Sequence, residues 1–463
     1  MTKFNIISRE NIKPSSPTPQ HLKTFNLSVL HQLIPAPYAP IIFFYPNYDY
    51  ATELQIIEHQ EHLKISLSQT LTHFYPLAGT IKDDFSIDCD DAGARYATMR
   101  VDTSLSEFLK HLDLGLINRL LPCDPTFDGS GGGTRVTNVQ VNVFACGGVA
   151  ISLCISHKIL DGTALATFVK CWASLHQENV RLVPDLTAHF LPATDSRLRD
   201  SSMAMWASLI KFGKCSTGRF VFDRFAIAKL KAEAGRNGVQ QPTRVEVVSA
   251  LLWKCVMAAS KETHGFKKPS LLGHSVNLRR RSGTVLSENS IGNLVWLASA
   301  ESGTMADIKF HDLVNQIACR LRFVSLHKFS LQVKGSILKI NSEFVTKLQG
   351  DNGPQVMEES LKLMKDCGTN GRLDYIGITS WCKMGFYEVD FGRGKPLWVC
   401  GHVSHGSPVF TDFVVLMDTR DGDGIEAWVN LDEHKMHILR HDPELLAFAS
   451  LDPSPLQICE VYD

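Results

Sequence analysis

The sequence lacks an excess of charge of either sign. Lysine and arginine together number 47, against 48 aspartate and glutamate residues, and the formal net charge is −1. Proteins that bind nucleic acid or an anionic membrane surface usually carry a strong basic bias, and this chain gives no such electrostatic footprint. We therefore expect neither nucleic acid nor a membrane among its partners. A neutral or modestly charged small molecule is the expected substrate.

Long apolar runs and paired cysteines are also missing. No stretch reaches the length of a membrane span, and the first ten residues, MTKFNIISRE, are too polar for a signal peptide. The 12 cysteines are scattered singly, without a Cys-x-x-Cys pair. In a chain without an export signal such thiols are expected to be reduced and mostly buried. The sequence thus predicts a cytoplasmic protein.

What the sequence does contain is a mixture of strand and helix patterns over 463 residues, a length that indicates two or more domains. An apolar strand is expected at 41–45 and a helix at 53–72. A second helix is expected to begin after Thr243, its N-cap, with Glu246 completing a capping box. Further strands are expected at 375–379, 386–391, 397–400, 410–417 and 425–430. Because no regular strand–helix–strand alternation is visible, we predict an α/β fold with one mixed sheet in each half.

The segment 192–217 is mixed polar and small, without clear periodicity. We interpret it as a long crossover between the two halves. The predicted division is a first domain over 1–195, a linker over 196–220 and a second domain over 221–463.

The most informative segment is SHKILDG at 156–162, in which Asp161 follows His157 by four residues and Gly162 comes next. With 18 histidines, about one accidental His-x-x-x-Asp is expected in such a chain, so the spacing alone is weak evidence. Its context is stronger, because 149–155 is typical of a buried strand and 164–176 of a helix with one apolar side. A histidine in a strand-to-helix turn is held by rigid backbone and faces a cleft, where a general base belongs.

Six motifs in order resemble those of the plant BAHD acyltransferase family, over essentially the whole chain. Two are the His157-x-x-x-Asp161-Gly162 segment and the late segment DFGRGKP at 390–396. The other four are YPLAG at 75–79, TRVEV at 243–247, VNLR at 276–279 and IGN at 291–293. The KPSSPTP opening at 13–19 and the SWC segment at 380–382 are most similar to the vinorine synthase-type clade of alkaloid and terpenoid O-acetyltransferases.

The resemblance implies two chloramphenicol-acetyltransferase-like domains, each a mixed β-sheet flanked by helices, with the active site in a channel between them. It implies acyl-CoA, above all acetyl-CoA, as co-substrate, no bound cofactor, and a monomeric enzyme acting on a hydroxyl of an alkaloid or terpenoid. His157 is then the general base, because neutral imidazole, with a pKa near 6.5, takes the acceptor's proton, and no acyl-enzyme forms. A family member that acylates an amine, uses a longer acyl-CoA or lacks catalytic activity is the alternative.

The resemblance also assigns a role to Asp161. The aspartate is expected to point away from the substrate and to pair with Arg279. A carboxylate left unpaired inside a cleft is costly, so loss of either partner is expected to distort the loop that carries His157.

Two further pairs are candidates for binding. Thr379 and Trp381 are candidate donors to the oxyanion, although a strand whose alternate residues simply pack explains them equally well. Thr243 and Arg244 are candidate contacts for CoA, and capping explains Thr243 equally well.

The late motif departs from the family pattern in two places. Arg393 stands where the family normally has tryptophan, and Met384-Gly385 stands where an aromatic-proline pair is usual. The motif resembles a structural turn away from the chemistry, built from Asp390, Gly392, Arg393 and Gly394. Arg393 is therefore expected to alter stability or the CoA entrance. It is expected either to face solvent or to reach a CoA phosphate.

Three other motifs suggest ligands but carry weaker signals. The GGG run at 131–133 lacks the spacing of a P-loop and is expected to form a hairpin loop. Cys400-x-His402-x-x-His405 offers three potential zinc ligands, but no matching pair stands elsewhere, and a loop lining the acceptor pocket is the alternative. The DGDG segment at 421–424 lacks the full spacing of a calcium loop and is expected to be a hairpin turn. We expect no metal site.

Overall fold

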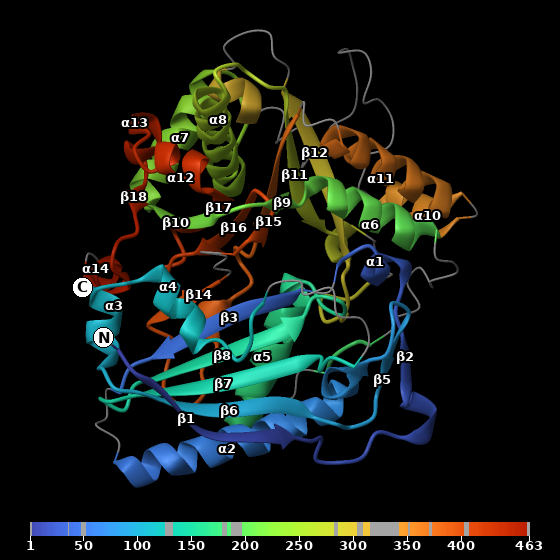
Figure 1. Ribbon diagram of the computed structural model, residues 1–463, viewed down its shortest axis with the longest axis vertical. Helices are drawn as coiled ribbons and strands as arrows, with labels where there is room; N and C mark the ends of the chain where they lie inside the picture. Colours follow the sequence, from blue (N-terminus) through green and yellow to red (C-terminus); the bar gives the residue numbers. More distant parts are fainter. Residues whose placement is uncertain are drawn as a thin grey trace.

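Two mixed sheets, each with helices packed on it, form the protein (Figure 1). The computed structural model describes residues 2–35, 37–47, 52–125, 133–177, 183–186, 197–281, 286–302, 309–314, 342–350, 352–369, 373–401 and 407–460. Within these ranges, no helix has both the length and the apolar character needed to cross a membrane.

The first sheet has six strands in the order β1-β6-β7-β8-β3-β14. Their bounds are β1 Phe4–Ile12, β3 Tyr38–Tyr45, β6 Ala94–Val101, β7 Thr137–Phe144, β8 Val149–Ser156 and β14 Trp398–Cys400. Only β6 and β7 run parallel to each other. Helices α2 (Glu53–His73) and α5 (Gly162–His176) pack against each other, and Figure 1 shows α2 at the bottom of the molecule and α5 behind the strands of this sheet. Smaller elements surround it: α1 Val29–Gln32, α3 Leu105–Lys110, α4 Leu114–Ile117, and strands β2 Thr24–Asn26, β4 Thr80–Ile81 and β5 Ser86–Asp88.

The second sheet has seven strands in the order β12-β11-β13-β16-β17-β10-β18. Their bounds are β10 Cys215–Phe222, β11 Ser270–Asn277, β12 Val295–Ser302, β13 Asp374–Ser380, β16 Phe413–Asp418, β17 Ile425–Asp432 and β18 Ser450–Leu451. Figure 1 shows α7 (Arg224–Arg236), α8 (Arg244–His264), α12 (Glu433–Leu439) and α13 (Pro443–Leu446) on one side of it. On the other side lie α6 (Arg197–Leu209), α10 (Ser342–Gln349) and α11 (Gly353–Thr369).

Most sequence-predicted elements are present, and two are different. The expected strand at 386–391 is instead the short 3-10 helix η5, Phe386–Glu388, because Gly385 before it adopts a left-handed φ of 69° that turns the chain. The expected crossover contains helix α6, whose buried side includes Leu198, Ser202 and Leu209. The polar Ser202 on that side hides the helical periodicity from the sequence.

The two halves of the chain are joined by a strand exchange. Strand β14 belongs to the carboxy-terminal half of the sequence, yet it pairs antiparallel with β3 and completes the first sheet, with Trp398 opposite Phe44. The rings of Trp398 and Phe44 stack, with their centroids 5.2 Å apart. The prediction of one sheet in each half is therefore correct only in part, because a strand of the second half completes the first sheet. The predicted residue bounds of the two domains remain a prediction.

Candidate active site

His157 stands where a fully buried strand gives way to a helix. Strand β8 is buried along its whole length, because its run of Val, Ala, Ile, Leu and Cys lies between two neighbouring strands. At its end the backbone N–H of His157 donates to the carbonyl of Pro37 at 2.8 Å. Helix α5 then begins at Gly162. The strand-to-helix turn predicted from the sequence is present.

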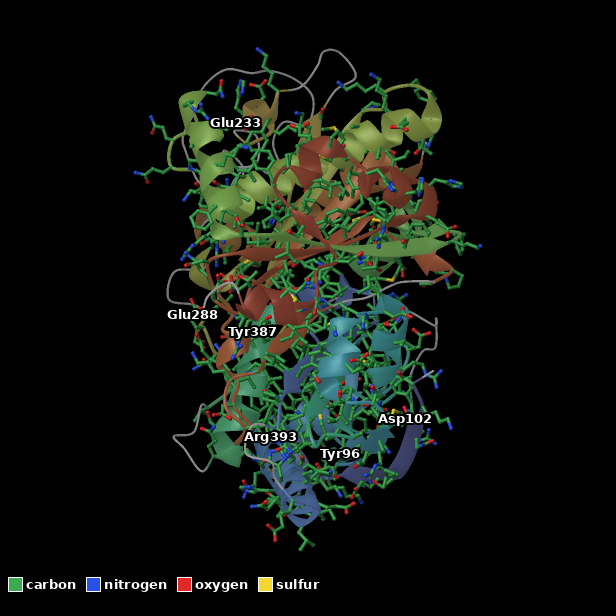
Figure 2. All side chains as sticks on the ribbon, turned by 90° about the vertical axis from the view of Figure 1, so that its left-hand side faces the viewer. Tyr96, Asp102, Glu233, Glu288, Tyr387 and Arg393 are labelled. Atoms are coloured by element: carbon green, nitrogen blue, oxygen red, sulfur yellow. The ribbon has the colours of Figure 1, made fainter. Side chains whose placement is uncertain are left out.

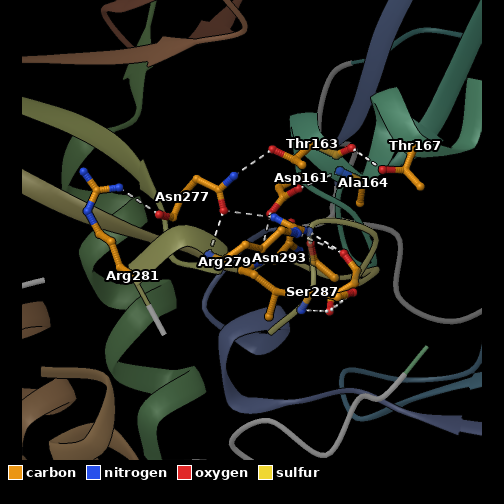
Figure 3. A network of polar contacts seen from close by, with 12 residues as sticks. Asp161, Thr163, Ala164, Thr167, Asn277, Arg279, Arg281, Ser287 and Asn293 are labelled. Atoms are coloured by element: carbon orange, nitrogen blue, oxygen red, sulfur yellow. Dashed lines mark hydrogen bonds and ion pairs between the residues drawn. The ribbon is translucent and has the colours of Figure 1, made fainter. Parts of the chain in front are cut away.

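Asp161 is the N-cap of α5 and uses both of its carboxylate oxygens away from His157. Oδ1 accepts from the N–H of Ala164 at 2.9 Å. Oδ2 accepts from the Arg279 guanidinium at 2.8 Å and from the N–H of Leu294 at 2.9 Å. Figure 3 shows this network, which joins the start of α5 to the segment that follows β11. The contact expected between Asp161 and Arg279 is therefore present, and both side chains are buried.

Asn293 makes two contacts with His157. Its Nδ2 donates to the His157 carbonyl oxygen at 2.5 Å, and this contact orients the amide so that Oδ1 faces the ring. The Oδ1 atom lies 3.1 Å from His157 Nδ1. Because an amide oxygen only accepts, the proton of the neutral ring is on Nδ1, and Nε2 keeps its lone pair. Burial lowers the pKa of His157, which keeps the ring neutral at pH 7.

The ion pair also holds the backbone on both sides of Asn293. Arg279 donates to the carbonyl of Gly292 at 3.2 Å, while Asp161 accepts from Leu294. In the sequence, Asn293 is only the last residue of the IGN motif, and no role is predicted for it. The motif spacing does not reveal this contact, because only the fold brings Asn293 to His157 across 136 positions of sequence.

A cavity of about 310 Å³ lies between the two sheets, with His157 in its wall. The lining residues come from α1, β3 and α5, from α6, and from strands β11, β12, β13 and β16 of the second sheet. Most of the lining side chains are apolar, among them Leu30, Pro40, Met205, Val295, Leu361 and Phe413. Such a wall favours a bulky apolar ligand that carries few polar groups.

Thr379 and Trp381 line the same cavity as His157. Thr379 is in the last part of β13, and Trp381 directly follows the strand. A Cβ placed on Gly162 would lie only 2.7 Å from Trp381 Nε1. The glycine of the HKILDG segment therefore lets the indole approach the first turn of α5.

Thr243 and Arg244 do not line this cavity. Thr243 caps α8, and its side chain and that of Glu246 form the predicted capping box. The Arg244 guanidinium pairs with the carboxylate of Asp418 and donates to the carbonyl of Gly422. Both residues thus have a structural explanation, and their contact with CoA stays a prediction.

The late motif also lies away from the cavity, against α2 and α5. The Asp390 carboxylate accepts from the N–H of Arg393 at 2.9 Å, and Gly392 and Gly394 have φ values of 76° and 75°. The half-buried Arg393 guanidinium donates to the carbonyl of Gly147 at 3.3 Å, in the turn between β7 and β8. Figure 2 labels Arg393 in the part of the molecule that holds the first sheet. The arginine is therefore partly covered by this turn and only partly exposed to solvent.

The second departure from the family pattern has a local cause. Gly385 has a φ of 69°, which a proline ring, fixed near −65°, cannot adopt. A Cβ at this position would also lie 2.6 Å from Lys170 Nζ. The preceding residue, Met384, lines the cavity, and its Cε would lie 3.2 Å from a Cβ on Gly162.

The remaining ligand-like motifs bring no site together. Among the residues that the structure describes, no three His, Cys, Asp or Glu side chains are grouped so as to hold a metal ion. Cys400 is buried at the end of β14, while His402 and His405 lie outside the described residues, as do Gly131 and Gly132. The 421–424 segment forms the turn between β16 and β17, as predicted.

Comparison with known proteins agrees with the fold. The model of the Transferase family matches residues 2–446. A limonoid 7-O-acetyltransferase of Citrus sinensis is 41% identical over 97% of this chain and 99% of its own length. A stemmadenine O-acetyltransferase of Catharanthus roseus is 34% identical over 95% and 97%. The crystal structure of vinorine synthase has a TM-score of 0.77 at 32% identity and covers 97% of this chain and 99% of its own.

These similarities span both sheets and the cavity between them, and they confirm the predicted α/β class with two chloramphenicol-acetyltransferase-like domains. The chain belongs to the Transferase family of BAHD enzymes and is an acyl-CoA-dependent acyltransferase.

Proposed function

We propose that the protein transfers an acetyl group from acetyl-CoA to a hydroxyl of a polycyclic plant metabolite, an alkaloid or a terpenoid. The observation that carries the proposal is the neutral His157 ring, whose Nδ1 is turned to Asn293 and whose Nε2 is free for the apolar cavity. An imidazole in this state has the lone pair that a general base needs. The relatives named as O-acetyltransferases of limonoids and of stemmadenine support the reaction type.

In the proposed reaction, His157 Nε2 removes the proton of the acceptor hydroxyl as its oxygen attacks the thioester carbonyl. The carbonyl π electrons move onto the oxygen, and the resulting oxyanion needs preorganised donors. The Thr379 hydroxyl and the Trp381 indole N–H belong to residues that line the same cavity, and we assign this role to them. The C–S bond then breaks, and the imidazolium returns its proton to the CoA thiolate.

A cysteine thiolate is the strongest side-chain nucleophile for a covalent acyl-enzyme. Among the described residues, no cysteine lines this cavity. Cys382 lies just beyond Trp381, and burial raises the pKa of its thiol to about 12, so that almost no thiolate forms at neutral pH. Direct attack by the acceptor is therefore the simpler route.

Asp161 and Arg279 act in this proposal as positioning residues. Their ion pair holds the backbone around Asn293, and Asn293 in turn fixes the tautomer of His157. We assign Thr243 and Arg244, at the start of α8, as contacts for CoA. A monomeric state and a cytoplasmic location, expected from the sequence, complete the proposal.

The proposal is tested by measuring thiol release from acetyl-CoA with a panel of polycyclic alcohols. We expect release that depends on the alcohol and is abolished by His157→Ala, because no other base lies at that position. His434→Ala, an exposed histidine at the start of α12, is the matched control and is expected to keep full activity. Release from acetyl-CoA that His157→Ala leaves unchanged would contradict the proposal.

The same assay separates the alternatives. Longer acyl-CoA donors test the acyl chain length, which the volume of the pocket sets. Matched amines in place of the alcohols test N-acylation. Faster transfer from a longer donor, or to the amine, would replace the corresponding part of the proposal.

A further inference from the structure

Strand β13 forms part of the cavity wall. Tyr375, Gly377 and Thr379 are alternate residues of this strand and line the cavity, as do Ile378 and Ser380 near its end. Ile376 does not line the cavity and belongs to the apolar core beneath α8. The cavity face of this strand therefore runs from a phenol, across a glycine, to the Thr379 hydroxyl.

A second glycine stands beside Gly377. Strands β11 and β13 are parallel and in register, with Gly273 opposite Gly377. A Cβ on Gly273 would lie 2.7 Å from the Tyr375 hydroxyl oxygen, and one on Gly377 would lie 3.1 Å from it. The Tyr375 hydroxyl therefore lies over Gly273 and Gly377, in the space that a side chain at either position would occupy.

The Tyr375 hydroxyl has no partner within the described part of the chain. Tyr375 is 8% exposed, and no hydrogen bond of its hydroxyl occurs there, although the residue lines the cavity. Its oxygen is not among the fully buried polar atoms without a partner, so it keeps accessible surface toward the cavity that the residue lines. In a mostly apolar cavity, a polar group of a ligand can satisfy this hydroxyl. The cavity is the place from which a partner can reach this hydroxyl.

The position of the Tyr375 hydroxyl sets its distance from the proposed reaction centre near Thr379. A strand rises about 3.3 Å per residue, so the site over Gly377 lies about 7 Å along β13 from Thr379, where the reaction is placed. A rigid molecule with two oxygen atoms about this far apart can place one near His157 and the other at Tyr375.

We propose that Tyr375 is a specificity-determining residue, which hydrogen-bonds a second oxygen of the acceptor about 7 Å from the hydroxyl that is acylated. The inference rests on the proposed function and names the acceptor class more closely, as a rigid, oxygenated polycycle. The glycine pair Gly273 and Gly377 keeps the phenol in place.

The experiment compares two rigid polycyclic secondary alcohols that differ only in a ketone about 7 Å from the hydroxyl. Their dissociation constants are measured by calorimetry without CoA, and kcat/KM is measured with acetyl-CoA. We expect wild-type protein to prefer the ketone about three- to tenfold, the range of one net hydrogen bond. Tyr375→Phe is expected to remove this preference and to leave the acetyl-CoA KM and the pH profile unchanged.

Two further variants separate this contact from general effects. Tyr96→Phe also removes a buried phenol without a hydrogen-bond partner, but in β6 outside the cavity, and is expected to keep the ketone preference. Gly273→Ala retains the phenol and displaces its hydroxyl, so the preference is expected to fall.

A ketone preference that is absent from the wild type, or that survives in Tyr375→Phe, would overturn the inference. Acetyl transfer to both alcohols with equal efficiency would then leave the proposed function intact. Conversely, a Tyr375-dependent binding preference without any transfer would support the contact and refute the proposed reaction.

Discussion

Asn293 Oδ1 lies 3.1 Å from His157 Nδ1, while Asn293 Nδ2 donates to the carbonyl oxygen of the same histidine. The Asn293 amide therefore contacts both the ring and the backbone of His157. Through this pair of contacts, a residue that touches no substrate sets which ring nitrogen accepts a proton. The Asp161–Arg279 pair holds the neighbouring backbone, so Asp161, Arg279 and Asn293 together position one imidazole.

Replacement of Asn293 by alanine is expected to lower kcat about 100-fold, because the ring loses its fixed tautomer and orientation. The KM for acetyl-CoA is expected to change little. Asn293→Asp places a carboxylate beside Nδ1, which favours the protonated ring, so the acidic limb of the pH profile of kcat/KM is expected to move to higher pH. Asn237→Ala, at the exposed end of α7, is the control for both. Unchanged kcat in Asn293→Ala would contradict the positioning role.

Removal of one partner of the buried ion pair is expected to destabilise the protein strongly. Asp161→Asn leaves the Arg279 charge buried without its counter-charge, and such losses cost about 3–5 kcal/mol. Urea unfolding measures the change. Lys347→Ala breaks the exposed pair with Glu343 in α10 and is expected to cost at most about 0.5 kcal/mol. Equal effects of the two substitutions would show that the buried pair is not structural.

Strands and helices with a strong local signal could be predicted from the sequence. The apolar runs at 41–45 and 149–155 are buried in the middle of a sheet, where no polar alternation is needed, and Thr243 with Glu246 marks the start of α8 by a capping box. Residues 386–391 could not be assigned in this way. The left-handed backbone of Gly385 decides their conformation, and composition alone does not reveal it.

Only part of the candidate site could be predicted. His157 and Asp161 are close in sequence, and the resemblance to a family supplied Arg279. Asn293 and Tyr375 were missed because their roles depend on long-range pairing: one reaches across 136 positions, and the other depends on the register between β11 and β13. Local spacing carries no information about such contacts.

The contact between Gly162 and Trp381 yields a test of coupling. Gly162→Ala places a Cβ within 2.7 Å of the indole nitrogen, so the indole must move, and kcat is expected to fall about tenfold if Trp381 donates to the oxyanion. In a Trp381→Phe background the same substitution is expected to have little further effect on kcat, because the effects of substitutions at residues in contact are not additive. Kinetics of the four proteins of this cycle measure the coupling. Fully additive losses would separate Gly162 from Trp381.

Acid is expected to weaken the packing of the late motif. The rings of His59 and His176 lie 5.1 Å apart against the loop of Phe391, whose carbonyl oxygen is 2.6 Å from His59 Nε2. Burial lowers the pKa of both histidines from 6.5 to about 4. Between these values the unfolded chain binds more protons, so stability that is complete above pH 6.5 is lost as the pH falls towards 4.

His176→Gln removes one of these groups, and we expect its Tm to fall less steeply than that of the wild type over this pH range. The exposed His434 is again the control, and His434→Gln is expected to follow the wild-type curve. Thermal unfolding followed by circular dichroism at a series of pH values gives both slopes. Because His59 and His176 lie outside the cavity lining, His176→Gln is also expected to keep its kcat at neutral pH. A wild-type slope in His176→Gln would show that this ring does not contribute to acid sensitivity.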